Sequence, residues 1–367
     1  MSSEQPFKRS KVLDSVRGIA ILFMIPLHLF LFGGGAESLV GEGGGGGGSS
    51  EWAALMAKLI VVNTQRPLGS GLVLFFFITG VALSLMLLKY KGKGLKQIEV
   101  RVLKRYGLYI LAGIAMSLLF RAFNYLQTPG AVFDPISWLY WTFRSFMDLS
   151  GPILGLGVSA IIAFPIIFKW DWKKLAFAGL VLAVIEAAAI YLIPFERHIV
   201  TNFFITNSFS VGKGLPLVLF GAAVGKWMGV GRKLDRRVVA VSAAVTLGYF
   251  IVPTLLGSGG WHMIIAVWAF PHAAIFIAAA GIFSLAIFQK LEERGTRLGA
   301  FQALGRSSFI VYYGHYLILM ILNAILGLAG VKVTLIMSVG ELVISTATIW
   351  LLIYYFSKRR WGPPSTW

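Results

Sequence analysis

Cysteine is absent from this chain of 367 residues, and charged side chains are scarce, at 13%. Without cysteine there can be no disulfide, thiolate metal site or thioester on the protein, so any acyl chemistry must use other nucleophiles. A charged fraction that is about half the usual one, together with 57% hydrophobic residues, excludes both a cytosolic enzyme and a disordered chain. The composition predicts a polytopic membrane protein.

Acidic residues are also few, because 33 lysines and arginines face only 15 aspartates and glutamates. Such a basic balance is compatible with nucleic-acid binding, but basic residues also flank membrane spans on the cytoplasmic side. In a chain this apolar the second explanation is the better one, and we expect the lipid bilayer, and no nucleic acid, as the partner.

Long apolar runs predict ten membrane-spanning helices, each near the roughly 20 residues needed to cross a bilayer. The predicted spans are 13–33, 68–89, 105–122, 144–168, 175–194, 209–229, 238–257, 262–288, 305–327 and 333–357. An eleventh span, or a half-buried helix, at 52–63 or 135–143 stays open. The predicted fold class is an all-α integral-membrane helix bundle.

Most lysines and arginines fall on one set of connections, and this asymmetry predicts that both termini are cytoplasmic. The expected organisation is a cytoplasmic tail over 1–12, a single transmembrane domain over 13–357 and a second cytoplasmic tail over 358–367. The expected location is the cell membrane, with several passes. The oligomeric state, including a homodimer, is left open by the sequence.

The first span carries three ionisable residues, Asp14, Arg17 and His28. Eleven residues separate Arg17 from His28, so helix geometry places both on one face, about 16 Å apart along the axis. Asp14 lies one turn before Arg17 and can pair with it. Arg17 as an interfacial anchor and His28 as a hydrogen-bonded bundle residue are the structural alternatives. Histidine is the natural general base at neutral pH.

His315 lies near the middle of the ninth span, where a structural role and a catalytic role are equally compatible with the sequence. Other ionisable residues within the spans are expected to pair with one another, because isolated charges are costly in a bilayer. These are Arg144, Asp148, Glu186, Lys213 and Glu341. Only Arg144 and Asp148 have a spacing that predicts a specific pair.

The segment 89–105 holds seven basic residues and one acid, more than topology requires. Topology alone is one explanation. The other is an anion site for a phosphorylated donor at Lys93, Arg101, Lys104 and Arg105. Arg306 is a further candidate for binding such a donor.

Several stretches resemble one known group of proteins. The stretches are LDSVRGIAI at 13–21, FFFITGVAL at 75–83, PLVLFGAAVG at 216–225 and LGRSSFIVYYGH at 304–315. They are similar, in this order, to motifs of the transmembrane acyltransferase superfamily, which includes acyltransferase family 3 and the heparan-α-glucosaminide N-acetyltransferase-like proteins. The Arg-x10-His spacing of Arg17 and His28 matches the first-helix motif of family 3.

The resemblance implies a bundle of about ten or eleven helices that moves an acyl group from cytoplasmic acyl-CoA to an acceptor reached from the far side. Acetyl-CoA is the expected donor, a sugar-like hydroxyl or an amine is the expected acceptor, and no metal is expected. The implied roles are catalysis for His28, with support from Arg17. Direct transfer and an acetyl-imidazole on His28 both remain open.

Two departures from the family pattern concern the site. Family 3 usually carries Arg-x-x-Arg after its second helix, whereas this chain has RVLKR at 101–105. The glucosaminide branch uses a histidine in the first outer loop, and residues 31–67 contain none. A different class of function, a proton-coupled transporter or flippase, is the alternative, because buried ionisable groups also form proton relays.

Overall fold

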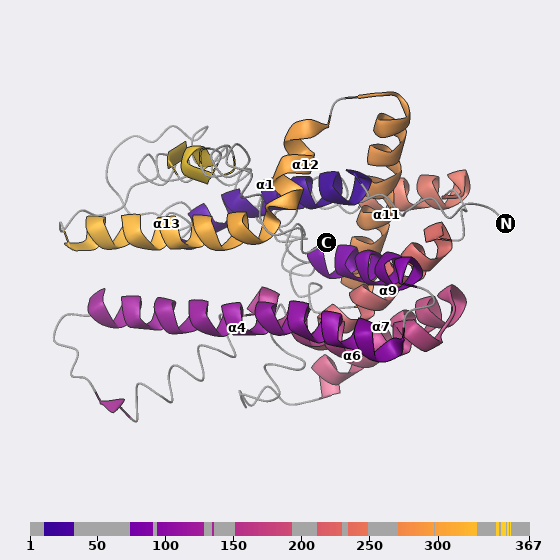
Figure 1. Cartoon of the computed structure of the whole chain (residues 1–367), viewed down its shortest axis with the longest axis horizontal. Helices are drawn as coiled ribbons and strands as arrows, with labels where there is room; N and C mark the ends of the chain where they lie inside the picture. The colour runs from indigo at the N-terminus through magenta and orange to yellow at the C-terminus, as the bar shows by residue number, and fades with distance from the viewer. Residues whose placement is uncertain are drawn as a thin grey trace. The chain divides into compact units, whose positions relative to one another are not determined.

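In the computed structural model, the described residues form helices joined by a few turns, with no strand among them (Figure 1). This confirms the predicted all-α class. The described residues are 11–32, 74–90, 94–127, 134–135, 151–192, 211–229, 234–248, 271–296, 298–328 and a few positions between 343 and 353.

Nine of the predicted spans overlap a described helix. The labelled helices are α1 (Lys11–Phe32), α4 (Leu95–Gln127), α6 (Gly151–Lys169), α7 (Trp172–Leu192), α9 (Val211–Gly229), α11 (Pro271–Glu293), α12 (Gly299–Arg306) and α13 (Ser308–Leu328). Two more are Leu74–Lys89 and 236–248. Of the tenth predicted span, 333–357, only scattered helical positions are described.

Length and apolar composition single out one segment of the described chain, Ala274–Glu293 in α11, as sufficient to cross a membrane. Shorter apolar helices are Leu74–Lys89, Ile153–Lys169 and Ser308–Leu322. The number of crossings and the side of the termini therefore stay predictions.

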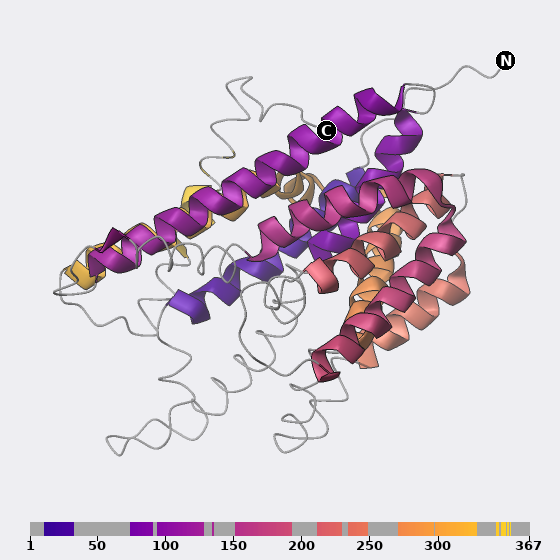
Figure 2. The ribbon, with the colours of Figure 1, turned by 90° about the horizontal axis from the view of Figure 1, so that it is seen from below.

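The chain divides into two compact units. Unit 1 comprises Met1–Val16, Val73–Leu119 and Phe133–Arg297, and unit 2 comprises Arg17–Leu72, Phe120–Val132 and Leu298–Trp367. Within unit 1, α9 packs against α6, α7 and α11 (Figure 2). The core of this unit is built from apolar residues of α9, α6, α4 and helix Leu74–Lys89, with Phe76, Tyr106 and Leu217 almost fully buried.

Helix Leu74–Lys89 and α9 approach each other so closely that their glycines leave no room for a side chain. A Cβ on Gly80 would overlap the carbonyl oxygen of Val218, and one on Gly221 would overlap that of Phe77. Further along, a Cβ on Gly225 would lie 2.7 Å from the carbonyl oxygen of Val81. From Phe77 to Val81 on the first helix, the contact moves from Gly221 to Gly225 on α9, so the two helices run parallel.

A hydrogen bond crosses this interface, from Ser84 Oγ to the carbonyl oxygen of Ala222 at 2.8 Å. Small residues that admit backbone contact, with a hydroxyl bonded across the contact, are the usual means of holding helices together in lipid. The glycine motifs at 75–83 and 216–225 are therefore explained by packing.

The pair α7 and α9 runs antiparallel, with contacts that recur every seven residues on both helices. Trp172 packs edge-on against Trp227 at 4.6 Å, and a Cβ on Gly179 would lie 3.2 Å from the Phe220 ring. Seven residues further along α7, Glu186 interacts electrostatically with Lys213. A repeat of seven residues is two helical turns, the periodicity of helices packed nearly in line.

Local signals fix the ends of these helices. The amide of Lys174 donates to Asp171 Oδ1 at 2.9 Å, which caps the start of α7 and lowers the pKa of Asp171 below its usual value. The end of α11 is closed by Gly295, whose φ of +73° suits glycine, and by the Thr296 amide, which donates to the Leu291 carbonyl at 3.0 Å.

The glycine interface predicts opposite effects for two alanine substitutions. Gly80→Ala should destabilise the protein by about 1–3 kcal/mol, because the methyl group overlaps the backbone of α9. Gly107→Ala on α4 is the matched control, since nothing lies within 4 Å of its added Cβ. It should be neutral or stabilising, by up to about 1 kcal/mol.

Thermal unfolding of the detergent-solubilised variants measures both effects. A Gly80→Ala protein that melts at or above the wild-type temperature would show that this close approach is not formed.

Candidate functional site

The first turns of α4 have a buried apolar face and an exposed basic face. Ile98, Val102 and Tyr106 recur every four residues, and all three are buried. Arg101 and Lys104 lie off this stripe and are exposed. The helix therefore holds these two cations at the surface of unit 1 while its other face is part of the core.

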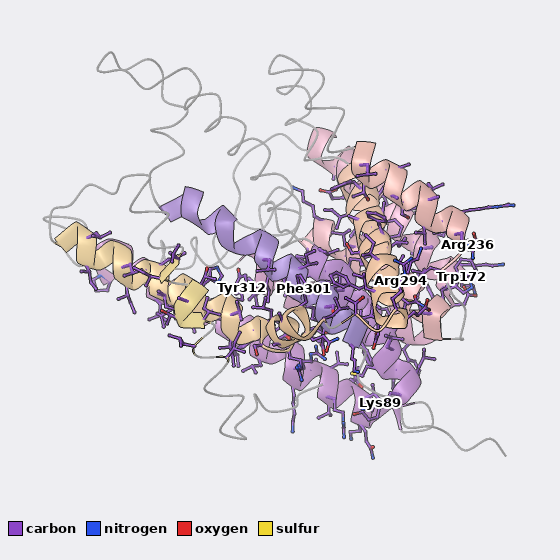
Figure 3. All side chains as sticks on the ribbon, turned by 90° about the horizontal axis from the view of Figure 1, so that it is seen from above. Lys89, Trp172, Arg236, Arg294, Phe301 and Tyr312 are labelled. Atoms are coloured by element: carbon purple, nitrogen blue, oxygen red, sulfur yellow. The ribbon has the colours of Figure 1, made fainter. Side chains whose placement is uncertain are left out.

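Arg101 is held by an aromatic residue that directly follows helix Leu74–Lys89. Its Nη1 donates to the Tyr90 hydroxyl at 2.6 Å, and its guanidinium lies 4.7 Å from the centre of the Tyr90 ring. The Nζ atom of Lys89, labelled in Figure 3, lies 5.8 Å from the same ring. Sequence reasoning selected Arg101 but missed Tyr90, because a tyrosine beside a helix end carries no distinctive pattern.

The other predicted donor-binding residues fall in different places. Arg105 is half-buried, with its guanidinium 5.3 Å from the Tyr106 ring centre. Lys93 lies outside the described residues. Arg306 belongs to unit 2, is exposed, and donates through Nε to the Gln302 carbonyl at 3.3 Å. The structure thus gathers Arg101, Lys104 and Arg105 on α4 and assigns Arg306 to the other unit.

The first span forms one continuous helix, as the shared face of Arg17 and His28 requires. Asp14 and Arg17 are both buried, at 3% and 7% exposure. His28 lies on the same helix, and its side chain is outside the described residues. Continuity of the helix supports the spacing argument, while the roles of Asp14, Arg17 and His28 stay predictions.

Gly18, the residue after Arg17, is a point of backbone contact within unit 2. A Cβ on Gly18 would overlap the carbonyl oxygen of Phe301, and would lie 2.9 Å from its Cα. Phe301 is in α12, the short helix that contains the first residues of the motif at 304–315 (Figure 3). The structure therefore brings together the first and last of the four family-like stretches.

His315 lies on the buried face of α13 and has no exposed surface. Its Nδ1 atom is 2.7 Å from the carbonyl oxygen of Val311, and the Tyr312 ring packs edge-on against it at 5.9 Å. Because a carbonyl only accepts, Nδ1 must carry the hydrogen, which leaves Nε2 as the basic nitrogen. The geometry thus accounts for His315 as a packed structural residue and also fixes the tautomer that a base would need.

Of the ionisable residues expected to pair inside the spans, the structure places Glu186 and Lys213 within electrostatic reach of each other. Glu186 is 8% exposed, and its Oε1 has no hydrogen-bond partner in the described part of the chain. Residues 144, 148 and 341 lie outside the described residues. The pairing was not readable from the sequence because it depends on the register of α7 against α9.

Comparison with known proteins identifies the class. Residues 11–357 match the sequence profile of the acyltransferase domain of family 3, Acyl_transf_3. The chain therefore belongs to acyltransferase family 3, whose members are membrane proteins that transfer acyl groups. This favours the acyltransferase prediction over the transporter or flippase alternative. Searches of curated proteins and of solved structures gave no match.

The contact at Gly18 yields a test in unit 2. Gly18→Ala should destabilise the packing of α1 on α12 by about 1–3 kcal/mol and lower activity, because the added methyl meets the Phe301 backbone. Gly314→Ala, next to His315, is the control, since its Cβ would enter open space. Unfolding temperature and acyl transfer are measured for both variants. Equal behaviour of the two variants would contradict the close approach.

Proposed function

We propose that the protein is a multi-pass enzyme of the cell membrane that transfers an acetyl group from cytoplasmic acetyl-CoA. The acceptor is a hydroxyl or amine of a sugar-like molecule reached from the outer side. The observation that carries this proposal is the family match over 11–357, which makes acyl transfer the chemistry to be explained. The basic surface on α4 supports an anionic donor, since CoA carries several phosphate charges.

The proposed roles divide between binding and proton transfer. Arg101, Lys104 and Arg105 bind phosphate oxygens of the donor. His28 acts as general base and takes the proton of the acceptor hydroxyl or amine. The acceptor atom then attacks the thioester carbonyl, a new C–O or C–N bond forms, and the C–S bond breaks. The thiolate of CoA leaves and receives the proton that His28 took.

Arg17 has a supporting role in this scheme, with Asp14 one turn away on the same helix. Both side chains are buried, so neither is a snorkelling residue exposed at the protein surface. His315 is the alternative base, and its fixed tautomer is compatible with that role. The substitution of His28 described next distinguishes between His28 and His315 as the base.

Replacing His28 tests the general-base role. His28→Ala should lower kcat for transfer from acetyl-CoA by about 10²- to 10⁴-fold, and should leave donor binding largely intact. Acetyl-CoA binding and turnover are measured on the purified protein. A folded variant that turns over at the wild-type rate would remove His28 from the mechanism and make His315 the leading base.

The donor site is tested by neutralising the basic surface. The triple substitution of Arg101, Lys104 and Arg105 by Gln should raise the KM for acetyl-CoA by at least about tenfold, because each charge-assisted bond contributes roughly 1–3 kcal/mol. Substituting Lys173, Arg236 and Arg237 by Gln removes the same charge from other connections and serves as the control. An equal KM in both variants would assign the α4 cations to topology alone.

A further inference from the structure

Two exposed cations lie against the ring of Tyr90, and no described carboxylate forms an ion pair with either of them. Lys89 and Arg101 both lie against this ring, at 5.8 Å and 4.7 Å. Lys104 lies one turn after Arg101 on α4, so a third cation is close by. All three cations are exposed and all belong to unit 1.

No carboxylate among the described residues forms an ion pair with Lys89, Arg101 or Lys104. The nearest acid in sequence, Glu99, projects about 200° around α4 from Arg101. Crowding like charges is unfavourable, and helices usually relieve it with an interleaved acid. Here the Tyr90 hydroxyl and ring instead hold the Arg101 guanidinium in place, and Lys89 contacts the same ring.

This arrangement leaves the guanidinium preorganised for an anion. One N–H of Arg101 donates to Tyr90, and its remaining donors have no acceptor in the part of the chain that the structure describes. A planar guanidinium with a fixed orientation suits two-point contact with phosphate oxygens. Three cations in one cluster suit a phosphomonoester, which carries nearly two negative charges at neutral pH, better than a singly charged diester.

We propose that Tyr90 is a positioning residue and that, with Lys89 and Arg101, it forms a binding site for a phosphomonoester group. The ligand that fits the proposed function, on which this inference rests, is the phosphomonoester of the acyl-CoA donor. Tyr90 acts through Arg101: it fixes the guanidinium by a hydrogen bond and by ring contact. A phosphomonoester lipid headgroup offers the same chemistry from the membrane, and the experiment separates the two sources.

The experiment compares two donors on two tyrosine variants. Wild-type protein, Tyr90→Phe and Tyr109→Phe are placed in phosphatidylcholine nanodiscs, and binding of acetyl-CoA and of its dephospho form, which lacks the phosphomonoester, is measured by calorimetry. Tyr90→Phe keeps the ring and removes the hydroxyl that holds Arg101. Tyr109→Phe is the control. It removes a hydroxyl from another tyrosine of the same unit, whose ring centre lies 5.6 Å from that of Tyr106.

Tyr90→Phe should weaken acetyl-CoA binding by about 3- to 10-fold and leave binding of the dephospho form unchanged. Tyr109→Phe should bind both ligands like the wild type. In turnover, Tyr90→Phe should raise the KM for acetyl-CoA without changing kcat. Lys89→Gln should also reduce the preference for acetyl-CoA over its dephospho form. If Tyr90 only stabilised the end of the helix, Lys89→Gln would leave this preference unchanged.

Four results would overturn the inference, each in a recognisable way. If the wild type binds both ligands equally, or if Tyr90→Phe weakens the binding of both ligands equally, the cluster does not recognise the phosphomonoester. If Tyr90→Phe binds acetyl-CoA like the wild type but, when phosphatidic acid is added to the nanodiscs, binds that lipid more weakly than the wild type, the site belongs to a lipid headgroup. If wild-type protein binds no acetyl-CoA at all, the proposed function itself fails, together with the donor assignment.

Discussion

The close approach of helix Leu74–Lys89 to α9 is the constraint on which the rest of unit 1 depends. Backbone contact at Gly80 and Gly221 places these two helices at the centre, and α6, α7 and α11 pack around α9. In lipid the hydrophobic effect does not drive helices together, so backbone proximity and the Ser84 hydrogen bond must supply the specificity. The position of Tyr90 at the end of the first of these helices, and hence of Arg101 beside it, follows from that contact.

The same principle operates in unit 2, where Gly18 meets the Phe301 backbone. The glycine that follows Arg17 lets α1 lie directly on the helix that leads to His315. The residue next to Arg17 on α1 is therefore a glycine in direct contact with the backbone of α12, and a contact this close leaves little room for either helix to shift. Such rigidity suits a site in which a base must stay within hydrogen-bond reach of its substrate.

The sequence was sufficient to predict the all-α class, the position of nine helices and the family, because long apolar runs and short ordered motifs are local properties. It was not sufficient for contacts that depend on helix register. Glu186 and Lys213 were both recognised as costly charges, yet only the seven-residue ladder between α7 and α9 pairs them. Tyr90 was missed for the same reason, since its contact with Arg101 depends on how the chain turns between two helices.

The regular contacts between α7 and α9 also indicate how far apart along the helices their polar and aromatic pairs lie. Fourteen residues separate Trp172 from Glu186, or about 21 Å of helix, so in the proposed topology the Glu186–Lys213 pair lies in the leaflet opposite the two tryptophans. A single charge at that depth would feel much of the membrane voltage, worth up to about 2.3 kcal/mol per 100 mV. In that topology, opposite charges on Glu186 and Lys213 at one depth would largely cancel each other's response to the membrane potential, and the packing of α7 on α9 would then be little affected by voltage.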